Sequence, residues 1–220
     1  MADKIIIYGT GPLAELMHYH FSQGSDYEVG AFCLDEQYKK ADQFCQLPVV
    51  TFETVTQHYP PDSYPMFVAI GYSVMRNREQ MFKKAKAAGY RLVNYISPHA
   101  TAREDLVMGE NNAIFSSSDI EPFVTLGNNN VVWTGTIIGH HAVVGDHNYI
   151  SGGGGVGGYC KVGNLCFIGN GAIMVNNINI ADETLMVSGT VILKDTEVAS
   201  RYHGNPSKLI GKHPDTGIVI

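Results

Sequence analysis

Positive charge is almost missing from the middle of this chain of 220 residues. Between Glu104 and Leu193 the only lysine or arginine is Lys161. A surface that follows a nucleic-acid backbone needs many basic residues to neutralise the phosphates. Nucleic acid is therefore not an expected partner.

The chain also lacks the residue spacing of a disulfide framework or a metal site. Its four cysteines include no CxxC pair, and its nine histidines show no ligand spacing. We expect free thiols in a reducing compartment. We expect no structural or catalytic metal, and the sequence leaves open magnesium on a bound nucleotide.

Long apolar segments are absent as well. A membrane helix needs a run of about 18 apolar residues, and none occurs. The stretch before Ile5 is far too short for the apolar core of a signal peptide. These absences predict a cytoplasmic protein that does not use a membrane.

What the chain does have is an aliphatic residue at every sixth position of its second half. The ladder consists of Met108, Ile114, Ile120, Leu126, Val132, Ile138, Val144, Ile150, Val156, Val162, Ile168, Met174, Ile180, Met186 and Ile192. A period of six matches neither a helix nor a simple strand, but it is typical of a hexapeptide parallel β-helix. Three hexads make a coil of about 18 residues with the ladder pointing inward.

Small residues and glycines accompany this ladder. The residue two places before a ladder position is usually small, as at Cys160 and Cys166, and is expected to share the interior. Glycine directly follows seven ladder positions, and we expect it to turn the corner with a positive φ. A coil that serves only as a spacer remains the alternative at this point.

Residues 1–97 predict a small Rossmann-like α/β domain with a parallel sheet. The expected strands are 4–8, 27–34, 66–71 and 91–96, and the expected helices are 12–22, a short one after a loop around Pro48, and 73–89. Arg78 is expected to join the inner face of the last helix by its aliphatic stem only.

A glycine motif lies at the first junction of strand and helix. Gly9-Thr10-Gly11 leads to Ala14, and such a turn at a helix start can hold a phosphate through backbone N–H groups. Asp35 ends the second strand, where dinucleotide enzymes have a ribose-binding acid. By itself the motif is weak evidence for phosphate binding, because a tight turn with Gly11 and Ala14 chosen for close packing would have the same residues. The unit is about half a dinucleotide fold, so a mononucleotide-sized ligand fits better than NAD.

Several motifs occur in an order that resembles one family. They are Ile7–Gly11, Ala69–Gly71 followed by Arg76, Gly89–Pro98, Ile138–His141 with Val144–Asp146, and Gly204–Lys208. Over nearly the whole chain this arrangement resembles the bacterial nucleotide-sugar N-acetyltransferases and the related sialic acid O-acetyltransferases. The resemblance implies a left-handed β-helix at 98–193, a homotrimer that holds acetyl-CoA between subunits, and a tail at 194–220 over the CoA site.

The resemblance also implies which residues bind the acceptor. The first domain is expected to bind the nucleotide of the sugar through Gly9, Thr10, Gly11, Asp35, Gly71 and Arg76. Tyr149 and Asn148 are candidates for the acceptor side of the coil. The alternative is that Tyr149 and Asn148 only face solvent on the outer side of the coil.

Acyl transfer to an amine needs a base for the amine proton and a donor for the developing oxyanion. His140 follows the Ile138-Gly139 corner, is expected to point outward with His141 and His147 nearby, and matches the base of the family. Gly158 lies one coil further, where its N–H is expected to meet the thioester oxygen. His141 stands where the family often has a carboxylate. The group that orients His140 is therefore open between His141, a backbone carbonyl and Asp146.

The CoA site is expected to combine a bare surface with basic residues. Glycines between Gly152 and Gly158 leave room for a pantetheine arm, and Lys208 in the basic tail matches a CoA contact of the family. Asn170 and Ser188 complete the cofactor-binding residues that we expect.

The sequence therefore predicts an acetyl-CoA-dependent N-acetyltransferase. Its expected acceptor is a nucleotide-linked amino sugar of the UDP- or dTDP-4-amino-4,6-dideoxy type, used in glycan or surface-polysaccharide synthesis. The homotrimer is expected to bury Phe115, Phe123 and Trp133, which the coil should expose. The alternatives are O-acetylation of a sugar such as sialic acid, and a β-helix scaffold without turnover.

Overall fold

The computed structural model describes residues 3–23 and 25–220. The chain divides into two compact units. The first contains the residues up to Gly71 together with Gln80–Tyr95, and the second contains Tyr72–Glu79 together with Ile96–Ile220. Helix α3 (Met75–Ala87) therefore begins in the second unit and ends in the first.

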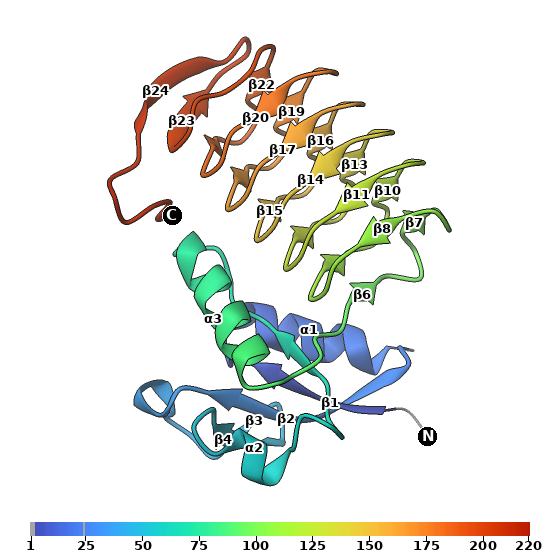
Figure 1. Cartoon of the computed structure of the whole chain (residues 1–220), viewed down its shortest axis with the longest axis vertical. Coiled ribbons are helices and arrows are strands. Elements are labelled where there is room, and N and C mark those ends of the chain that lie inside the picture. The colour runs from blue at the N-terminus through green and yellow to red at the C-terminus, as the bar shows by residue number, and fades with distance from the viewer. Residues whose placement is uncertain (1–2, 24) are drawn as a thin grey trace. The chain divides into compact units, whose positions relative to one another are not determined.

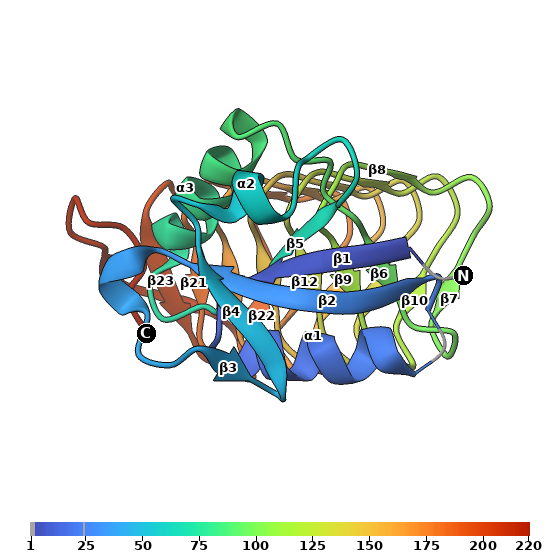
Figure 2. The same ribbon diagram turned by 90° about the horizontal axis from the view of Figure 1, so that it is seen from below.

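The first unit is built on a five-stranded sheet with the order β3-β4-β2-β1-β5 (Figure 2). Neighbouring strands run parallel except β3 and β4. The elements are β1 (Asp3–Tyr8), α1 (Pro12–Ser22), β2 (Tyr27–Leu34), η1 (Glu36–Tyr38), β3 (Gln43–Phe44), β4 (Leu47–Thr51), α2 (Val55–His58) and β5 (Met66–Val68). The small sheet expected before the coil is confirmed.

Three parts of the sequence prediction for residues 1–97 differ from the structure. Strand β5 ends at Val68 and not at Gly71. Pro48 lies inside β4 and not in a loop. It is the second residue of that strand, where a missing N–H costs the sheet little. The strand expected at 91–96 is reduced to β6 (Tyr95–Ile96) and a single bridge between Met66 and Leu92.

Helix α1 packs its apolar face against β1 and β2. Leu13, Ala14, Met17 and Phe21 are its buried residues, which is the spacing of one helical face. The helix follows Gly11, and no side chain caps its start. Gly9 and Gly11 lie between β1 and α1. Neither has a side chain that could cover the N-terminus of α1.

The second unit is a parallel β-helix whose strands form three sheets (Figure 1). We name them after one central strand each: the β13 sheet (β22-β19-β16-β13-β10-β7), the β14 sheet (β20-β17-β14-β11-β8) and the β15 sheet (β24-β23-β21-β18-β15-β12-β9-β6). The strands are β7 (Thr101–Ala102), β8 (Val107–Met108), β9 (Ala113–Ile114), β10 (Asp119–Ile120), β11 (Thr125–Leu126), β12 (Val131–Val132), β13 (Ile137–Ile138), β14 (Val143–Val144), β15 (Tyr149–Ile150), β16 (Gly155–Val156), β17 (Lys161–Val162), β18 (Phe167–Ile168), β19 (Ile173–Met174), β20 (Asn179–Ile180), β21 (Leu185–Met186), β22 (Val191–Ile192), β23 (Ser200–His203) and β24 (Lys208–Lys212).

The expected coil length and the inward ladder are confirmed. Ile137 pairs with Gly155, and Val143 pairs with Lys161, so each strand meets the strand 18 residues further along. From Ile114 to Ile192 no ladder residue is more than 5% exposed. Burial raises the pKa of the Cys166 thiol to about 12, as expected for a cysteine that only fills the core.

The glycines after the ladder do not have the backbone conformation that we expected. All seven lie in the described chain, and none has a positive φ. Positive φ occurs three residues after a ladder position, for example at His141 and Gly171. The glycines are needed for space instead. A Cβ on Gly169 would lie 2.6 Å from Ser188 N and 2.7 Å from Met186 O in the next coil.

Late residues of the chain return to the start of α3. Strand β23 adds in parallel to β21, and β24 pairs antiparallel with β23. Further on, the Met75 N–H donates to Ile218 O and the Ile220 N–H donates to Ser73 O, both at 3.1 Å. Ile218 is completely buried. Residues 218–220 therefore hold the Tyr72–Glu79 segment within the second unit.

The two kinds of glycine should respond differently to substitution. Gly169→Ala forces a Cβ against the backbone of the next coil, so we expect the free energy of unfolding to fall by about 1–3 kcal/mol. Gly171→Asn is the matched control, because Gly171 has a φ of +64° and open space around it, and asparagine tolerates this conformation. Denaturant unfolding that gave the two variants equal stability would contradict the steric role.

Candidate active site

His140 lies at the corner between the β13 and β14 sheets, two residues after Ile138. Its side chain is exposed, as expected. The backbone N–H of His140 donates to Glu121 Oε2 at 2.6 Å, which ties this corner to the coil before it. Nδ1 of His140 lies 3.1 Å from Nδ1 of His141. The two imidazoles are thus in direct hydrogen-bond contact.

His141 occupies a corner position with a φ of +61°. Its ring stacks on Tyr159, with centroids 4.5 Å apart and an interplanar angle of 15°. Phe123 contacts the same ring, with centroids 4.7 Å apart. Phe123 and Tyr159 are the equivalent residues of the preceding and following coils, so coil stacking fixes the orientation of His141.

Gly158 lies beside His140 in the next coil, as the spacing predicts. A Cβ on Gly158 would lie 3.1 Å from Nε2 of His140, so the imidazole faces a surface without a side chain. The Gly158 N–H was expected to meet the thioester oxygen. In the structure this N–H already donates to Asn176 Oδ1 at 2.9 Å. An oxyanion would have to share it with Asn176 or displace Asn176.

Two other polar candidates lie on another edge of the coil. Asp146 accepts from the Asn128 N–H at 2.6 Å, and its own N–H donates to Asn164 Oδ1 at 2.8 Å. It belongs to a ladder of corner side chains between the β14 and β15 sheets and does not orient His140. His147 is 6% exposed and contacts Asn129 at 2.9 Å. The expected cluster of His147 with His140 does not form.

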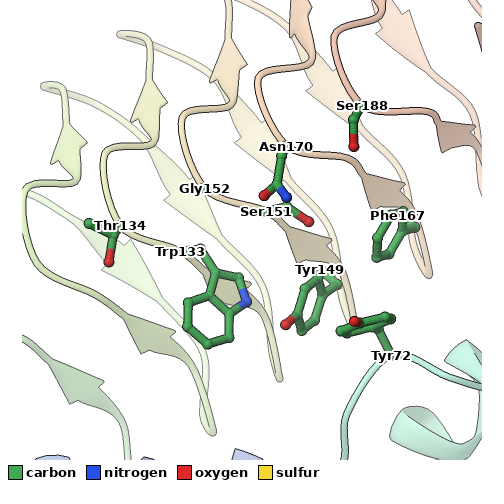
Figure 3. Close-up of a pocket in the computed structure, with 9 residues that line it drawn as sticks. All are labelled: Tyr72, Trp133, Thr134, Tyr149, Ser151, Gly152, Phe167, Asn170 and Ser188. Atoms are coloured by element: carbon green, nitrogen blue, oxygen red, sulfur yellow. The ribbon is translucent and has the colours of Figure 1, made fainter.

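A pocket of about 260 Å³ opens at the corner between the β15 and β13 sheets (Figure 3). It brings together three of the predicted residues, Tyr149, Asn170 and Ser188. Burial raises the pKa of Tyr149 to about 12, so its hydroxyl stays protonated at neutral pH. Asn148 does not line this pocket. It is buried in the coil, where its Oδ1 accepts from the Cys166 N–H at 2.7 Å.

Aromatic residues form one side of this pocket, namely Tyr72, Trp133 and Phe167. The sequence analysis expected Trp133 at a subunit interface and did not single out Tyr72 or Phe167. Tyr149 and Phe167 stack with an interplanar angle of 8°, and the Tyr72 ring lies 4.7 Å from the Tyr149 ring. The 18-residue spacing of Tyr149 and Phe167 was the available signal for their stacking. Tyr72 had no comparable signal, because it reaches the coil from a distant part of the chain.

The expected exposure of the aromatic residues holds only in part. Phe123 is 62% exposed, but Phe115 is buried and Trp133 is half-buried. Phe115 and Trp133 stack on each other with their centroids 4.5 Å apart. The indole N–H of Trp133 is buried, and the centroid of the indole lies 6.0 Å from that of the Tyr149 ring.

The predicted catalytic and cofactor-binding residues lie on two different edges of the coil. The corner with His140 and Gly158 lies between the β13 and β14 sheets. The corner with Asn170 and Ser188 lies between the β15 and β13 sheets. Both edges border the β13 sheet. Within one chain they do not meet.

Two arginines at the start of α3 serve the packing of the second unit. Arg78 was expected to bury only its stem, but it is 1% exposed and its Nη2 donates to Asn129 O at 2.6 Å. Burial lowers the pKa of Arg78 to about 10. Arg76, a predicted substrate-binding residue, forms a two-pronged pair with Glu183 at 2.6 and 2.9 Å. Its guanidinium is therefore already engaged.

The two glycines of the motif in the first unit differ in their surroundings. Gly9 is required by the backbone, whereas Gly11 has open space beside it. Gly9 has a φ of +129°, and a Cβ there would lie 2.8 Å from Ala69 O, so the backbone itself requires glycine. A Cβ on Gly11 or on Gly71 would meet nothing within 4 Å. Thr10 lines a hollow of about 200 Å³ with Tyr38, Lys40 and Phe44 among its walls. The bare glycines leave the ends of β1 and β5 open to a ligand.

Asp35 is engaged within the first unit. Its carboxylate accepts from the Tyr8 hydroxyl, and Lys84 Nζ lies 2.7 Å from Oδ1. Burial, with the Asp35 hydrogen bond as the next cause, raises the pKa of Tyr8. A ribose hydroxyl at Asp35 would therefore share a carboxylate that already has two partners.

Lys208, at the start of β24, is exposed. Residues 3–23 and 25–220 contain no group of three His, Cys, Asp or Glu side chains arranged for a metal ion. In the same part of the chain no helix is both apolar enough and long enough to span a membrane.

No protein-family model and no curated protein matches this chain. Solved structures do match it. The acetyltransferase domain of PglB from Neisseria gonorrhoeae FA1090 in complex with acetyl coenzyme A is 20% identical with a TM-score of 0.85, over 96% of this chain and 100% of that one.

Two further structures are similar over nearly their whole length. A mutant of perosamine N-acetyltransferase from Caulobacter crescentus, in complex with CoA and GDP-perosamine, is 23% identical with a TM-score of 0.85, over 96% of this chain and 99% of that one. WeeI from Acinetobacter baumannii AYE is 18% identical with a TM-score of 0.79, over 94% of this chain and 100% of that one. This chain has the same fold as these three proteins.

Proposed function

We propose that this protein is an acetyl-CoA-dependent N-acetyltransferase that acts on a nucleotide-linked amino sugar. The observation that carries the proposal is an exposed imidazole, His140, whose Nε2 faces the bare position of Gly158 on a hexapeptide coil. The matching fold of proteins solved with acetyl coenzyme A, or with CoA and GDP-perosamine, supports it.

The chemistry needs a base but no protein nucleophile. An amine that attacks the thioester carbon becomes acidic as the new C–N bond forms, and His140 Nε2 can take its proton. The same nitrogen can then protonate the leaving sulfur of CoA. A cysteine nucleophile is disfavoured, because burial raises the pKa of Cys33, Cys160 and Cys166 and keeps these thiols protonated.

Each unit has a feature that suits one part of the acceptor. The bare positions Gly11 and Gly71 suit the phosphates of a nucleotide at the strand ends of the first unit. The pocket with Tyr149 suits the sugar, because aromatic faces pack against a sugar ring. A UDP- or dTDP-linked 4-amino-4,6-dideoxy sugar, used in surface-polysaccharide synthesis, is the acceptor that we infer. The 6-methyl group of such a sugar fits an aromatic wall.

A homotrimer is part of the proposal. Along the outer face of the β13 sheet Ile137 is 51% and Ile173 is 44% exposed, and Gly155 between them has no side chain. A cyclic assembly around this apolar face would bring the edge with His140 of one copy against the edge with Asn170 and Ser188 of the next. The site would then be complete only between copies.

The remaining parts of the proposal follow from the resemblance of the sequence motifs. The coil is left-handed, and Lys208 contacts a phosphate of CoA. The N-acetyltransferases, and not the sialic acid O-acetyltransferases, are the group to which we assign the chain.

His140→Ala should lower kcat by roughly 10²–10⁴, which is the usual contribution of a general base. The binding of CoA, measured by calorimetry, should change little. Steady-state assays of acetyl-CoA consumption check the first value. An alanine variant with full activity would remove His140 from the mechanism.

Gly11→Val should raise the KM for the nucleotide sugar and leave the KM for acetyl-CoA unchanged, because the valine occupies the space that a phosphate would enter. The variant should fold normally, since nothing lies within 4 Å of a Cβ at Gly11. The assay compares UDP- and dTDP-linked amino sugars with free sialic acid. Turnover of sialic acid alone, unaffected by this substitution, would favour an O-acetyltransferase.

Light scattering should give a mass of three times 24.0 kDa. Ile137→Asp places a charge on the proposed interface and should yield a folded, inactive monomer. Val107→Asp is the matched control, because Val107 is 63% exposed on the β14 sheet and lies outside that interface. A wild-type enzyme that is active as a monomer contradicts the assembly.

A further inference from the structure

The pair of imidazoles at the His140 corner can hold only one proton between its facing nitrogens. The Nδ1 atoms of His140 and His141 are 3.1 Å apart, so one of them carries a hydrogen and the other accepts it. Two arrangements are possible for the neutral pair. Only the one in which His140 Nδ1 donates leaves a lone pair on His140 Nε2, the nitrogen that faces Gly158.

The surroundings of His141 suit a fixed acceptor. Its ring is stacked on Tyr159 at 4.5 Å and contacts Phe123 at 4.7 Å. These rings belong to the coils on either side and fix the plane of the His141 ring. Within that plane, the contact of its Nδ1 with His140 Nδ1 selects the orientation in which Nδ1 faces His140. The Tyr159 ring also meets the His140 ring edge-on, at a centroid distance of 5.1 Å.

We propose that His141 is a neutral positioning residue that accepts the Nδ1 hydrogen of His140 and thereby keeps Nε2 of His140 free as the base. This role rests on the proposed acetyl transfer. His141 itself keeps its proton on Nε2 throughout the reaction. The amine proton goes to Nε2 of His140 and then to the sulfur of CoA, so the pair returns to its starting state.

A neutral acceptor has a consequence for the pH dependence. The ionisable groups that face the pair are Glu121, which binds the backbone N–H of His140, and Tyr159. Neither contacts Nδ1 of His140, which has His141 as its partner. A carboxylate in place of His141 would stabilise the protonated form of His140. The base would then be lost at a higher pH than with an uncharged acceptor.

Three substitutions at position 141 separate the hydrogen bond from the ring stack. His141→Phe keeps a ring between Phe123 and Tyr159 but removes the acceptor. His141→Asn removes the ring but places an amide oxygen where Nδ1 was, and asparagine tolerates the φ of +61° at this corner. His141→Asp offers a charged acceptor at the same place.

We expect kcat of His141→Phe to fall by about 10–100-fold, the usual effect of removing a residue that orients another, with the KM for acetyl-CoA unchanged. His141→Asn should recover most of this loss. His141→Asp should also be active, but the acid limb of its kcat profile should lie about one pH unit above that of His141→Asn. Circular dichroism confirms that each variant is folded.

Three outcomes would overturn the role of His141. They are full activity of His141→Phe, equal loss in His141→Phe and His141→Asn, and matching pH profiles for His141→Asn and His141→Asp. Each of these leaves the proposed function intact if His140→Ala is inactive. An active His140→Ala would instead remove the base itself. The two failures are therefore distinguishable.

Discussion

Backbone hydrogen bonds between neighbouring coils hold the second unit together, and they fix where each of its side chains lies. Ile137 N donates to Gly154 O and Val143 N donates to Cys160 O, at 3.0 and 2.9 Å. This spacing repeats along all three sheets. A residue's place in its hexad therefore decides whether it points inward, stands at a corner or faces outward. A site on such a coil is built from columns of equivalent residues.

Two of the corner columns show how a site can arise on a repetitive frame. At the corner between the β14 and β15 sheets, the Asn128 N–H donates to Asp146 Oδ1 and the Asp146 N–H donates to Asn164 Oδ1, so each side chain accepts from the coil before it. At the corner with His140, the column of equivalent residues runs through Pro122, Gly158 and Asn176, and Asn176 Oδ1 accepts from the Gly158 N–H. The His140 N–H donates to Glu121 Oε2, which lies outside this column. Pro122 has no N–H to donate to a side chain at position 140, so the His140 ring takes no part in this pattern and faces Gly158.

The sequence predicted this coil well because its period is carried by single residues. The inward ladder and the place of Gly158 beside His140 follow from counting by six and by eighteen. What counting could not reveal is what covers an outward residue. Phe115 was expected on the surface, but the neighbouring coil places Trp133 over it. His147 was grouped with His140 by sequence distance, although the two belong to different edges.

Contacts between distant parts of the chain were also beyond the sequence. Arg78 was assigned a buried stem from its helical face, but its guanidinium binds Asn129, which lies 51 residues away. The pairing of Arg76 with Glu183 is of the same kind. The glycines after the ladder positions were a different case. The sequence showed where they lie, but the physical reason that glycine is needed there was not predicted. The neighbouring backbone of the next coil was the missing information.

The anchoring of the Tyr72–Glu79 segment implies an order of events during synthesis. Each coil needs only the preceding coil to form its hydrogen bonds, so the β-helix can grow as the chain leaves the ribosome. The segment with Tyr72 must wait, because Arg76 meets Asp215 across 139 residues and Ser73 meets Ile220. Tyr72, which forms one wall of the pocket with Tyr149, is therefore synthesised early. Its segment can be held in place only after the last residues of the chain have been made.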